Sequence, residues 1–343
     1  MGRPSGRPNL LLQSEASRHL PPASYTGTVS LNEQEQGAPT ITVKHRLEYL
    51  LLRCFVELLA AMPRAVARQV GAGIGWIAYR IVPRLRAVGQ QNLAMAFPEK
   101  TGAEREEILR QTYRNLGYQI AEFCHMPQYG HKTVEKFIRY EGFENFSRAL
   151  ARGKGVFVLT GHLGAWELSS FYHSLMGNPM DIVIRRLDNP LVDDFVNGIR
   201  CEHGNRVLHK DDFARGLIAS MRAGRTVGVL MDTNMTPPQG VFVPFFGVPA
   251  CTASGVPRIA ERTGAAVLPG FLLWEKSERR YVLHFGEELD LVKTGDSEAD
   301  ALTNTAMFTA VLEKYIRAYP EQWLWMHRRW KTRPEGEKGI YQR

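Results

Sequence analysis

The sequence predicts an α/β sandwich with a mostly parallel sheet, preceded by a helical segment that associates with a membrane. From residue 155 onward, short apolar runs alternate with segments whose apolar residues recur at helical spacing, which is typical of strands joined by helices. Between residues 47 and 82, two densely apolar segments are interrupted by charged residues. We expect a tail over 1–40 and a single domain over 41–343, with membrane-associated helices at 41–82 and an α/β core at 155–335.

Composition limits the classes of protein that fit. The 343 residues are 44% hydrophobic and 23% charged, which is ordinary for a globular chain. The net charge of +8 suits anionic lipid headgroups or an acidic partner protein. No nucleic-acid-binding motif accompanies this charge, so we expect no nucleic-acid partner. Four widely spaced cysteines without a C-x-x-C pair favour reduced thiols in a cytosolic compartment.

The first 82 residues divide into a tail and two apolar segments. Residues 1–40 are rich in Pro, Ser, Gly, Glu and Gln, a composition typical of disorder. The segment 47–62 carries Arg53 and Glu57 within its apolar run, so it does not offer the roughly 20 apolar residues of a spanning helix. A helix lying in the membrane interface and an amphipathic core helix fit it equally. The segment 66–82 contains Gly71, Gly73 and Gly75, which favour close helix packing. Together the two segments predict a hairpin that enters one leaflet.

The remaining elements follow from apolar periodicity and from Gly and Pro breaks. Helices are expected at 104–126, 132–140 and 143–152. Within the α/β core, the same pattern predicts strands at 156–160, 181–184, 206–208 and 226–231, and a helix that begins at Pro190. After an extended aromatic segment at 241–249, we expect a helix at 252–263, strands at 266–274 and 281–285, and a helix at 302–319.

Charged side chains follow three of the predicted strands. His162, Arg185 and Asp232 each stand where a strand ends. Because ligands of such sheets gather at the carboxyl ends of parallel strands, these residues predict a site on one rim. Glu167 enters the first turn of the next helix, and Gly161 and Gly164 surround His162 with backbone that can turn sharply.

The pair His162 and Glu167 suits acyl transfer. A neutral imidazole can take the proton of an attacking hydroxyl, and a carboxylate can fix its tautomer. No Ser or Cys nucleophile is near, so His162 would activate the acceptor directly, and backbone N–H groups between Gly161 and Gly164 or at the helix start would hold the oxyanion. The alternative is a structural histidine with a carboxylate in a first helical turn. A zinc site is disfavoured, since neither an H-E-x-x-H motif nor paired cysteines are present.

Two further groups are candidates for binding. Phe245 and Phe246 could line a groove for a fatty acyl chain, and a packed edge of the core is an equal alternative. Trp323 and Trp325 precede a basic run, a combination that suits the level of lipid headgroups or the binding of phosphate. That run contains Arg328, Arg329 and Lys331.

Four blocks in order resemble the lipid A secondary acyltransferases, the lauroyl and myristoyl transferase family with its H-x4-E motif. They are GHLGAWE at 161–167, IRRLDNPL at 184–191, GVFVPFFGVP at 240–249 and PEQWLWMHRRWK at 320–331. The resemblance covers about residues 41–335. The chain has Ala165 where the family usually has Asn, Ile184-Arg185-Arg186 where it usually has Tyr-Arg-Pro, and Asn234 where many members carry an acid.

The resemblance implies a glycerolipid-acyltransferase-like fold and a transferase at the cytoplasmic face of the inner membrane. The implied donor is an acyl chain on acyl carrier protein, and the implied acceptor is a hydroxyl of a lipid A precursor. His162 would be the base and Glu167 its orienter, with Arg185 an electrostatic helper, Asp232 and Gly164 further site residues, and no metal or cofactor. Alternatives are another acceptor, such as a phosphatidylinositol mannoside or an aminolipid, and a non-catalytic lipid-binding relative.

Overall fold

The structure is a computed structural model that describes residues 40–209 and 213–341. The predicted tail, apart from Thr40, lies outside these ranges.

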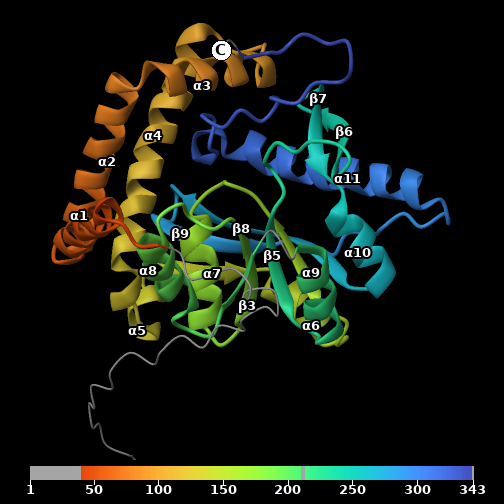
Figure 1. Cartoon of the computed structure of the whole chain (residues 1–343), viewed down its shortest axis with the longest axis horizontal. Coiled ribbons are helices and arrows are strands. Elements are labelled where there is room, and N and C mark those ends of the chain that lie inside the picture. The colour runs from red at the N-terminus through yellow and green to blue at the C-terminus, as the bar shows by residue number, and fades with distance from the viewer. Residues whose placement is uncertain (1–39, 210–212, 342–343) are drawn as a thin grey trace, which may run out of the picture. The chain divides into compact units, whose positions relative to one another are not determined.

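Seven strands form the central sheet in the order β1-β9-β8-β2-β5-β3-β4 (Figure 1). Their bounds are β1 Ile138–Glu141, β2 Val156–Thr160, β3 Met180–Ile184, β4 Arg206–His209, β5 Thr226–Leu230, β8 Ala266–Glu275 and β9 Arg280–Phe285. Neighbouring strands are parallel except for the antiparallel pair β8 and β9. The predicted α/β fold with a mostly parallel sheet is therefore confirmed.

Both faces of the sheet are covered by helices. In β2, Val156 and Val158 face a core shared with α6, α7 and α8, whereas Phe157 and Leu159 face a core shared with α9, α10 and α11. The near-continuous apolar run of this strand follows from burial on both sides. The helices are α6 Phe143–Leu150, α7 Trp166–Leu175, α8 Pro190–Cys201, α9 Phe213–Arg222, α10 Gly255–Thr263 and α11 Ser297–Ala318.

The chain before the sheet forms a group of helices. These are α1 Val43–Ala60, α2 Arg64–Ile81, α3 Pro83–Ala96 and α4 Gly102–His125, followed by η1 Met126–Gln128 and α5 His131–Val134. The prediction of N-terminal helices is confirmed, and α2 and α4 lie side by side (Figure 1). A Cβ on Gly71 would lie 2.1 Å from the carbonyl oxygen of Gly117, and one on Gly75 would lie 2.1 Å from that of Tyr113. Glycine at these two positions therefore lets the helix backbones touch.

A buried ion pair reinforces this contact. Glu122 of α4 is 1% exposed and receives N–H groups from Arg64 and Arg68 of α2. Burial would raise the pKa of Glu122, but the Arg64 and Arg68 guanidinium groups and the Tyr129 hydroxyl outweigh it and lower the pKa below its usual range. None of the helices in the described ranges is both long and apolar enough to cross a bilayer.

One local prediction is wrong, and two features, a hairpin and a helix, were not predicted. Part of the expected helix at 132–140 is strand β1, whose residues pair with β9 about 140 positions away in the chain, a partner that local periodicity does not reveal. The extended segment at 241–249 is a hairpin of β6 Gly240–Phe245 and β7 Val248–Ala253. It reverses at Phe246 and Gly247, which have φ of +52° and +73°. Helix α3, opened by Pro83, was not expected.

Candidate active site

Two neighbouring strands bring His162 and Asp232 together. β2 and β5 are parallel with Thr160 opposite Leu230, so the residues two positions beyond each strand lie beside one another. The Nδ1 of His162 is 2.9 Å from Oδ1 of Asp232, and its backbone N–H donates to Oδ2 at 2.7 Å. Gly161 makes room for this contact, since a Cβ there would lie 3.0 Å from the Asp232 carboxyl carbon.

Burial and charge act in opposite directions on this pair. Burial would lower the pKa of His162, but the Asp232 carboxylate and, more weakly, Glu167 outweigh it and raise that pKa. Burial would likewise raise the pKa of Asp232, but His162 and the hydrogen bonds it receives lower it to about 2. Asp232 is therefore ionised at neutral pH and stabilises the imidazolium form of His162.

Glu167 lies in the first turn of α7, as predicted, but its partner is Arg200 rather than His162. The guanidinium of Arg200, on α8, donates to both carboxylate oxygens at 2.9 and 2.6 Å. The sequence-based expectation that Glu167 orients the imidazole is therefore corrected, because Nδ1 faces Asp232. Glu167 instead adds a negative charge within electrostatic reach of His162.

A third contact to Asp232 comes from the C-terminal segment. The indole Nε1 of Trp323 donates to Oδ2 of Asp232 at 2.8 Å. Trp323 is 1% exposed and forms an antiparallel bridge with Leu163. The backbone N–H of Leu324 donates to the carbonyl of His162 at 3.0 Å, and that of Gly164 donates to the carbonyl of Gln322 at 3.0 Å. The segment 322–324 thus forms one wall of the site.

An apolar cavity of about 190 Å³ lies next to Glu167. Its lining comes from α1, α4, α7 and α8, and includes Leu52, Phe55, Ile120, Phe123, Trp166 and Val196. The Trp166 ring also packs edge-on to the His162 ring, with 5.2 Å between ring centroids. The cavity therefore begins one side chain away from the imidazole.

The other predicted site residues are placed differently. Arg185 follows β3 at the same rim, but its side chain is 78% exposed and pairs with Asp188 at 2.8 Å. Gly164 has φ of +67°, and a Cβ there would lie 2.1 Å from the Leu272 carbonyl oxygen, so it is required by the turn. Phe245 and Phe246 are buried against Trp323, Trp325 and Trp330, which favours the packed core edge over the exposed groove.

Most of the aromatic–basic cluster is buried, although Lys331 is exposed. Trp323 and Trp325 are buried, and Arg329 is 0% exposed, donating to the carbonyl of Cys251 and the hydroxyl of Thr252. Burial lowers the pKa of Arg329 to about 10. The expectation that Arg328 or Arg329 binds a phosphate at headgroup level does not hold for Arg329, because it is buried, and it stays a prediction for Arg328. Arg328 is half-buried, with its guanidinium 5.8 Å from the centre of the Tyr341 ring.

Sequence reasoning missed Arg200 and the role of Trp323. Arg200 stands 33 residues from Glu167, and Trp323 stands 91 residues from Asp232. The available signal for Arg200 was its position at the end of an amphipathic helix that follows the predicted rim. Among the described residues, no group of three or more His, Cys, Asp or Glu side chains is arranged to hold a metal ion.

Comparison with known proteins gives a consistent result. A family described as bacterial lipid A biosynthesis acyltransferase matches residues 39–332. The chain is 28% identical over 285 residues to the lipid A biosynthesis palmitoleoyltransferase of Escherichia coli (strain K12), covering 83% of this chain and 91% of that protein. It is 29% identical over 287 residues to the lauroyltransferase of the same strain, again covering 83% and 91%. The myristoyltransferase of that strain is 25% identical over 285 residues, covering 83% and 87%.

Proposed function

This chain belongs to the bacterial lipid A biosynthesis acyltransferase family, and from its site we propose how it works as an acyltransferase. It moves a fatty acyl chain from the thioester of acyl carrier protein to a hydroxyl of a lipid A precursor. His162 is the general base and Asp232 its orienter. The observation that carries this proposal is the His162–Asp232 pair at the carboxyl ends of β2 and β5, one aromatic ring away from an apolar cavity.

The proton path follows from which ring nitrogen is engaged. Because Nδ1 of His162 donates to the ionised Asp232, the neutral imidazole leaves Nε2 as its free lone pair. Nε2 takes the proton of the acceptor hydroxyl while the oxygen attacks the thioester carbonyl. The C–S bond then breaks, and the imidazolium returns the proton to the departing thiolate.

The start of α7 supports the oxyanion. The backbone N–H groups of His162, Gly164 and Ala165 already donate to Asp232, Gln322 and Leu272, so they do not serve the reaction. The N-cap residue of α7, Ala165, makes no side-chain hydrogen bond to the first turn. Uncapped N–H groups and the helix dipole at this end favour a developing negative charge.

The cavity beside Glu167 holds the acyl chain. Its lining is almost wholly apolar, and Val196 of α8 contributes to it whereas Val192, one turn earlier, does not. We expect the Val196→Phe side chain to fill part of the cavity. The ratio of transfer of the longest accepted acyl chain to transfer of a chain four carbons shorter should then fall about tenfold, because each buried methylene contributes roughly 0.8 kcal/mol. Competition assays with mixed acyl donors measure this ratio. Val192→Phe is the matched control, and an unchanged ratio in Val196→Phe contradicts the assignment.

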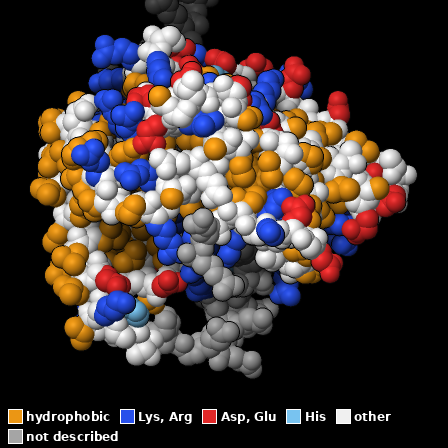
Figure 2. Space-filling view, turned by 90° about the horizontal axis from the view of Figure 1, so that it is seen from above, with side chains coloured by type: hydrophobic (Ala, Val, Ile, Leu, Met, Phe, Trp, Pro, Cys, Tyr) orange, Lys and Arg blue, Asp and Glu red, His pale blue; other side chains and the backbone are white. Residues whose placement is uncertain are grey.

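The N-terminal helices supply the contact with the membrane. Of the exposed large apolar side chains in the described part of the chain, all except Leu187 and Leu302 lie between Ile41 and Leu85. They gather at the left of the view in Figure 2, over α1 and α2. Val43 is 83% exposed, and Leu51 and Leu58 are each 61% exposed. Apolar side chains in this number on adjacent helices favour insertion into one leaflet, at the cytoplasmic face of the inner membrane.

Removing apolar side chains from α1 is expected to release the protein from lipid. The triple variant Leu47→Gln, Leu51→Gln and Leu58→Gln should bind anionic vesicles at least about tenfold more weakly, because burying each leucine contributes on the order of 1.5–3 kcal/mol. Vesicle sedimentation with the detergent-free protein measures this. The control is Leu187→Gln with Leu302→Gln, which removes exposed leucines elsewhere. Equal binding of both variants contradicts the interfacial role.

The acceptor is tested separately from the chemistry. Mass spectrometry of products formed with acyl carrier protein and a lipid A precursor should show one added acyl group. Transfer to a phosphatidylinositol mannoside or an aminolipid instead would assign another acceptor. Failure of the thioester to be consumed with any acceptor would support a non-catalytic lipid-binding protein.

A further inference from the structure

The C-terminal segment donates a hydrogen bond to the Asp232 carboxylate, in addition to its packing in the core. Asp232 is buried, and three N–H groups converge on it: two from His162 and the indole N–H of Trp323. The Trp323 bond and the His162 backbone bond share Oδ2, whereas Oδ1 faces the imidazole. A hydrogen bond to one oxygen of a carboxylate withdraws charge from the other.

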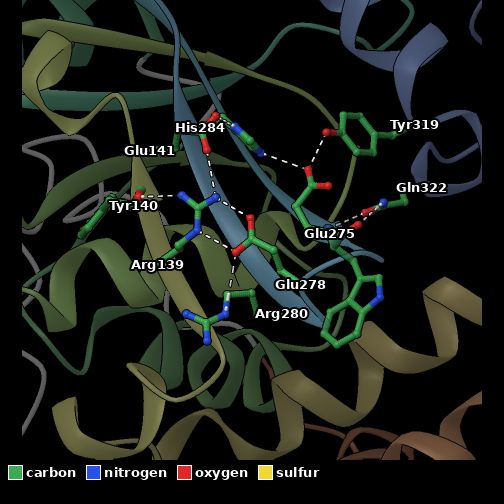
Figure 3. A network of polar contacts seen from close by, with 10 residues as sticks. Arg139, Tyr140, Glu141, Glu275, Glu278, Arg280, His284, Tyr319 and Gln322 are labelled. Atoms are coloured by element: carbon green, nitrogen blue, oxygen red, sulfur yellow. Dashed lines mark hydrogen bonds and ion pairs between the residues drawn. The ribbon is translucent and has the colours of Figure 1, made fainter.

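The position of Trp323 is fixed from both sides. Its ring packs edge-on against Trp325, with 4.5 Å between centroids, and against Phe245. The preceding residue, Gln322, exchanges two hydrogen bonds with the backbone of Trp274, at 2.9 and 3.0 Å. Figure 3 shows Gln322 beside Tyr319, whose hydroxyl donates to Glu275 of β8 at 2.5 Å. Packing against two aromatic rings and the hydrogen bonds of the neighbouring residue to β8 therefore fix the indole N–H on Asp232.

We propose that Trp323 is a positioning residue whose indole N–H sets how strongly Asp232 holds a proton on His162. With the N–H in place, part of the carboxylate charge is directed away from the imidazole, and His162 loses its proton at lower pH than it otherwise would. His162 is then neutral, and able to accept a proton, over a wider range of pH. This proposal depends on the proposed function only where it is tested by enzyme activity.

Other charged and titratable groups also face the pair. Glu167, paired with Arg200, acts on His162 from α7 and α8. His327 and Arg329 act from the C-terminal segment, and burial lowers the pKa of His327 so that it stays neutral at physiological pH. The Trp323→Phe substitution removes none of these groups, so each of them is present in both proteins that the test compares.

The test compares Trp323→Phe with Trp325→Phe in the full chain. Each variant loses one buried indole N–H, but that of Trp325 donates to the carbonyl of Pro320 at 2.6 Å. We expect Trp323→Phe to move the acid limb of the activity profile to higher pH, lowering relative activity on that limb about threefold, as half a pH unit does. Trp325→Phe should leave the limb in place. A limb that moves equally in both variants, or in neither, overturns the proposal.

Direct titration keeps this test separate from the reaction. With ¹³C-labelled histidine, the His162 signal is assigned from its loss in His162→Gln, and its midpoint should rise in Trp323→Phe. If the titration midpoint of His162 moves but the wild-type protein transfers no acyl group, the inference is supported and the proposed function is overturned. If the wild-type protein transfers acyl groups but the midpoint does not move, the proposed function is supported and the inference is overturned. If Trp323→Phe does not fold, 5-fluorotryptophan keeps the ring and strengthens the N–H donor. The midpoint should then fall, and an unchanged midpoint overturns the inference.

Discussion

Replacing His162 by alanine is expected to lower turnover by about 10²- to 10⁴-fold, which is the usual contribution of a general base. The loss follows from the removal of Nε2, the ring nitrogen that Asp232 leaves free. Single-turnover transfer from acyl carrier protein to the lipid acceptor measures it. His131→Ala, which removes an exposed histidine on α5, is the matched control. Activity within twofold of the wild type in a folded His162→Ala protein would exclude this base.

The pH dependence of the wild-type enzyme follows from the same geometry. The neutral imidazole is the active form, and Asp232 raises the pKa of His162 above its ordinary value. Activity should therefore be lost as the pH falls through this raised pKa, and be retained above it.

Replacing Asp232 by asparagine is expected to lower turnover by about 10³-fold or more, whereas Glu167→Gln should cost only about tenfold. The side-chain amide introduced by Asp232→Asn can donate to Nδ1 and so place the proton on Nε2, which is the wrong tautomer for a base. Glu167 acts on the imidazolium through space, and its bonds go to Arg200. The values of kcat and KM for both variants across a range of pH provide the measurement.

The two variants distinguish two models of the dyad. If Glu167 were the orienter, as the sequence alone suggested, the order of the two losses would be reversed. The acid limb remaining in Asp232→Asn should also move to lower pH, because the charge that raises the pKa of His162 is gone. A limb at the wild-type position in that variant would contradict the role given to Asp232.

The strands that carry the site were predictable from the sequence, and the partners of their side chains were not. The apolar run Val156–Thr160 predicted both the strand and the rim that carries His162, since the ends of parallel strands meet at one edge. Arg185 was placed at that rim correctly, but its side chain turns to Asp188, a choice that strand periodicity does not encode. The partner of Glu167 depends on how α8 packs against α7, and the third contact of Asp232 depends on the return of the chain at Trp323.

Composition also misled at the end of the chain. Aromatic and basic residues together are typical of a membrane interface, yet Trp323, Trp325 and Arg329 are buried. The guanidinium of Arg329 is tolerated there because a backbone carbonyl and a hydroxyl accept N–H groups from its two terminal nitrogens, and because the Phe245 ring lies 5.0 Å from its central carbon. Whether an arginine near tryptophans is a surface or a core residue depends on the elements that close over it, here the β6–β7 hairpin.

Helix α1 has consequences for how this enzyme is handled. Leu52, Phe55 and Val56 line the cavity, whereas Leu47, Leu51 and Leu58 of the same helix are exposed. Under the proposed function, helix α1 therefore separates the bilayer from the acyl chain, and within residues 40–209 and 213–341 its Leu47, Leu51 and Leu58 side chains are exposed. The amphiphile that surrounds the purified protein then becomes a variable of the assay. Chain-length preferences measured in detergent micelles and in lipid bilayers need not agree, and the bilayer values are the ones that describe the enzyme at work.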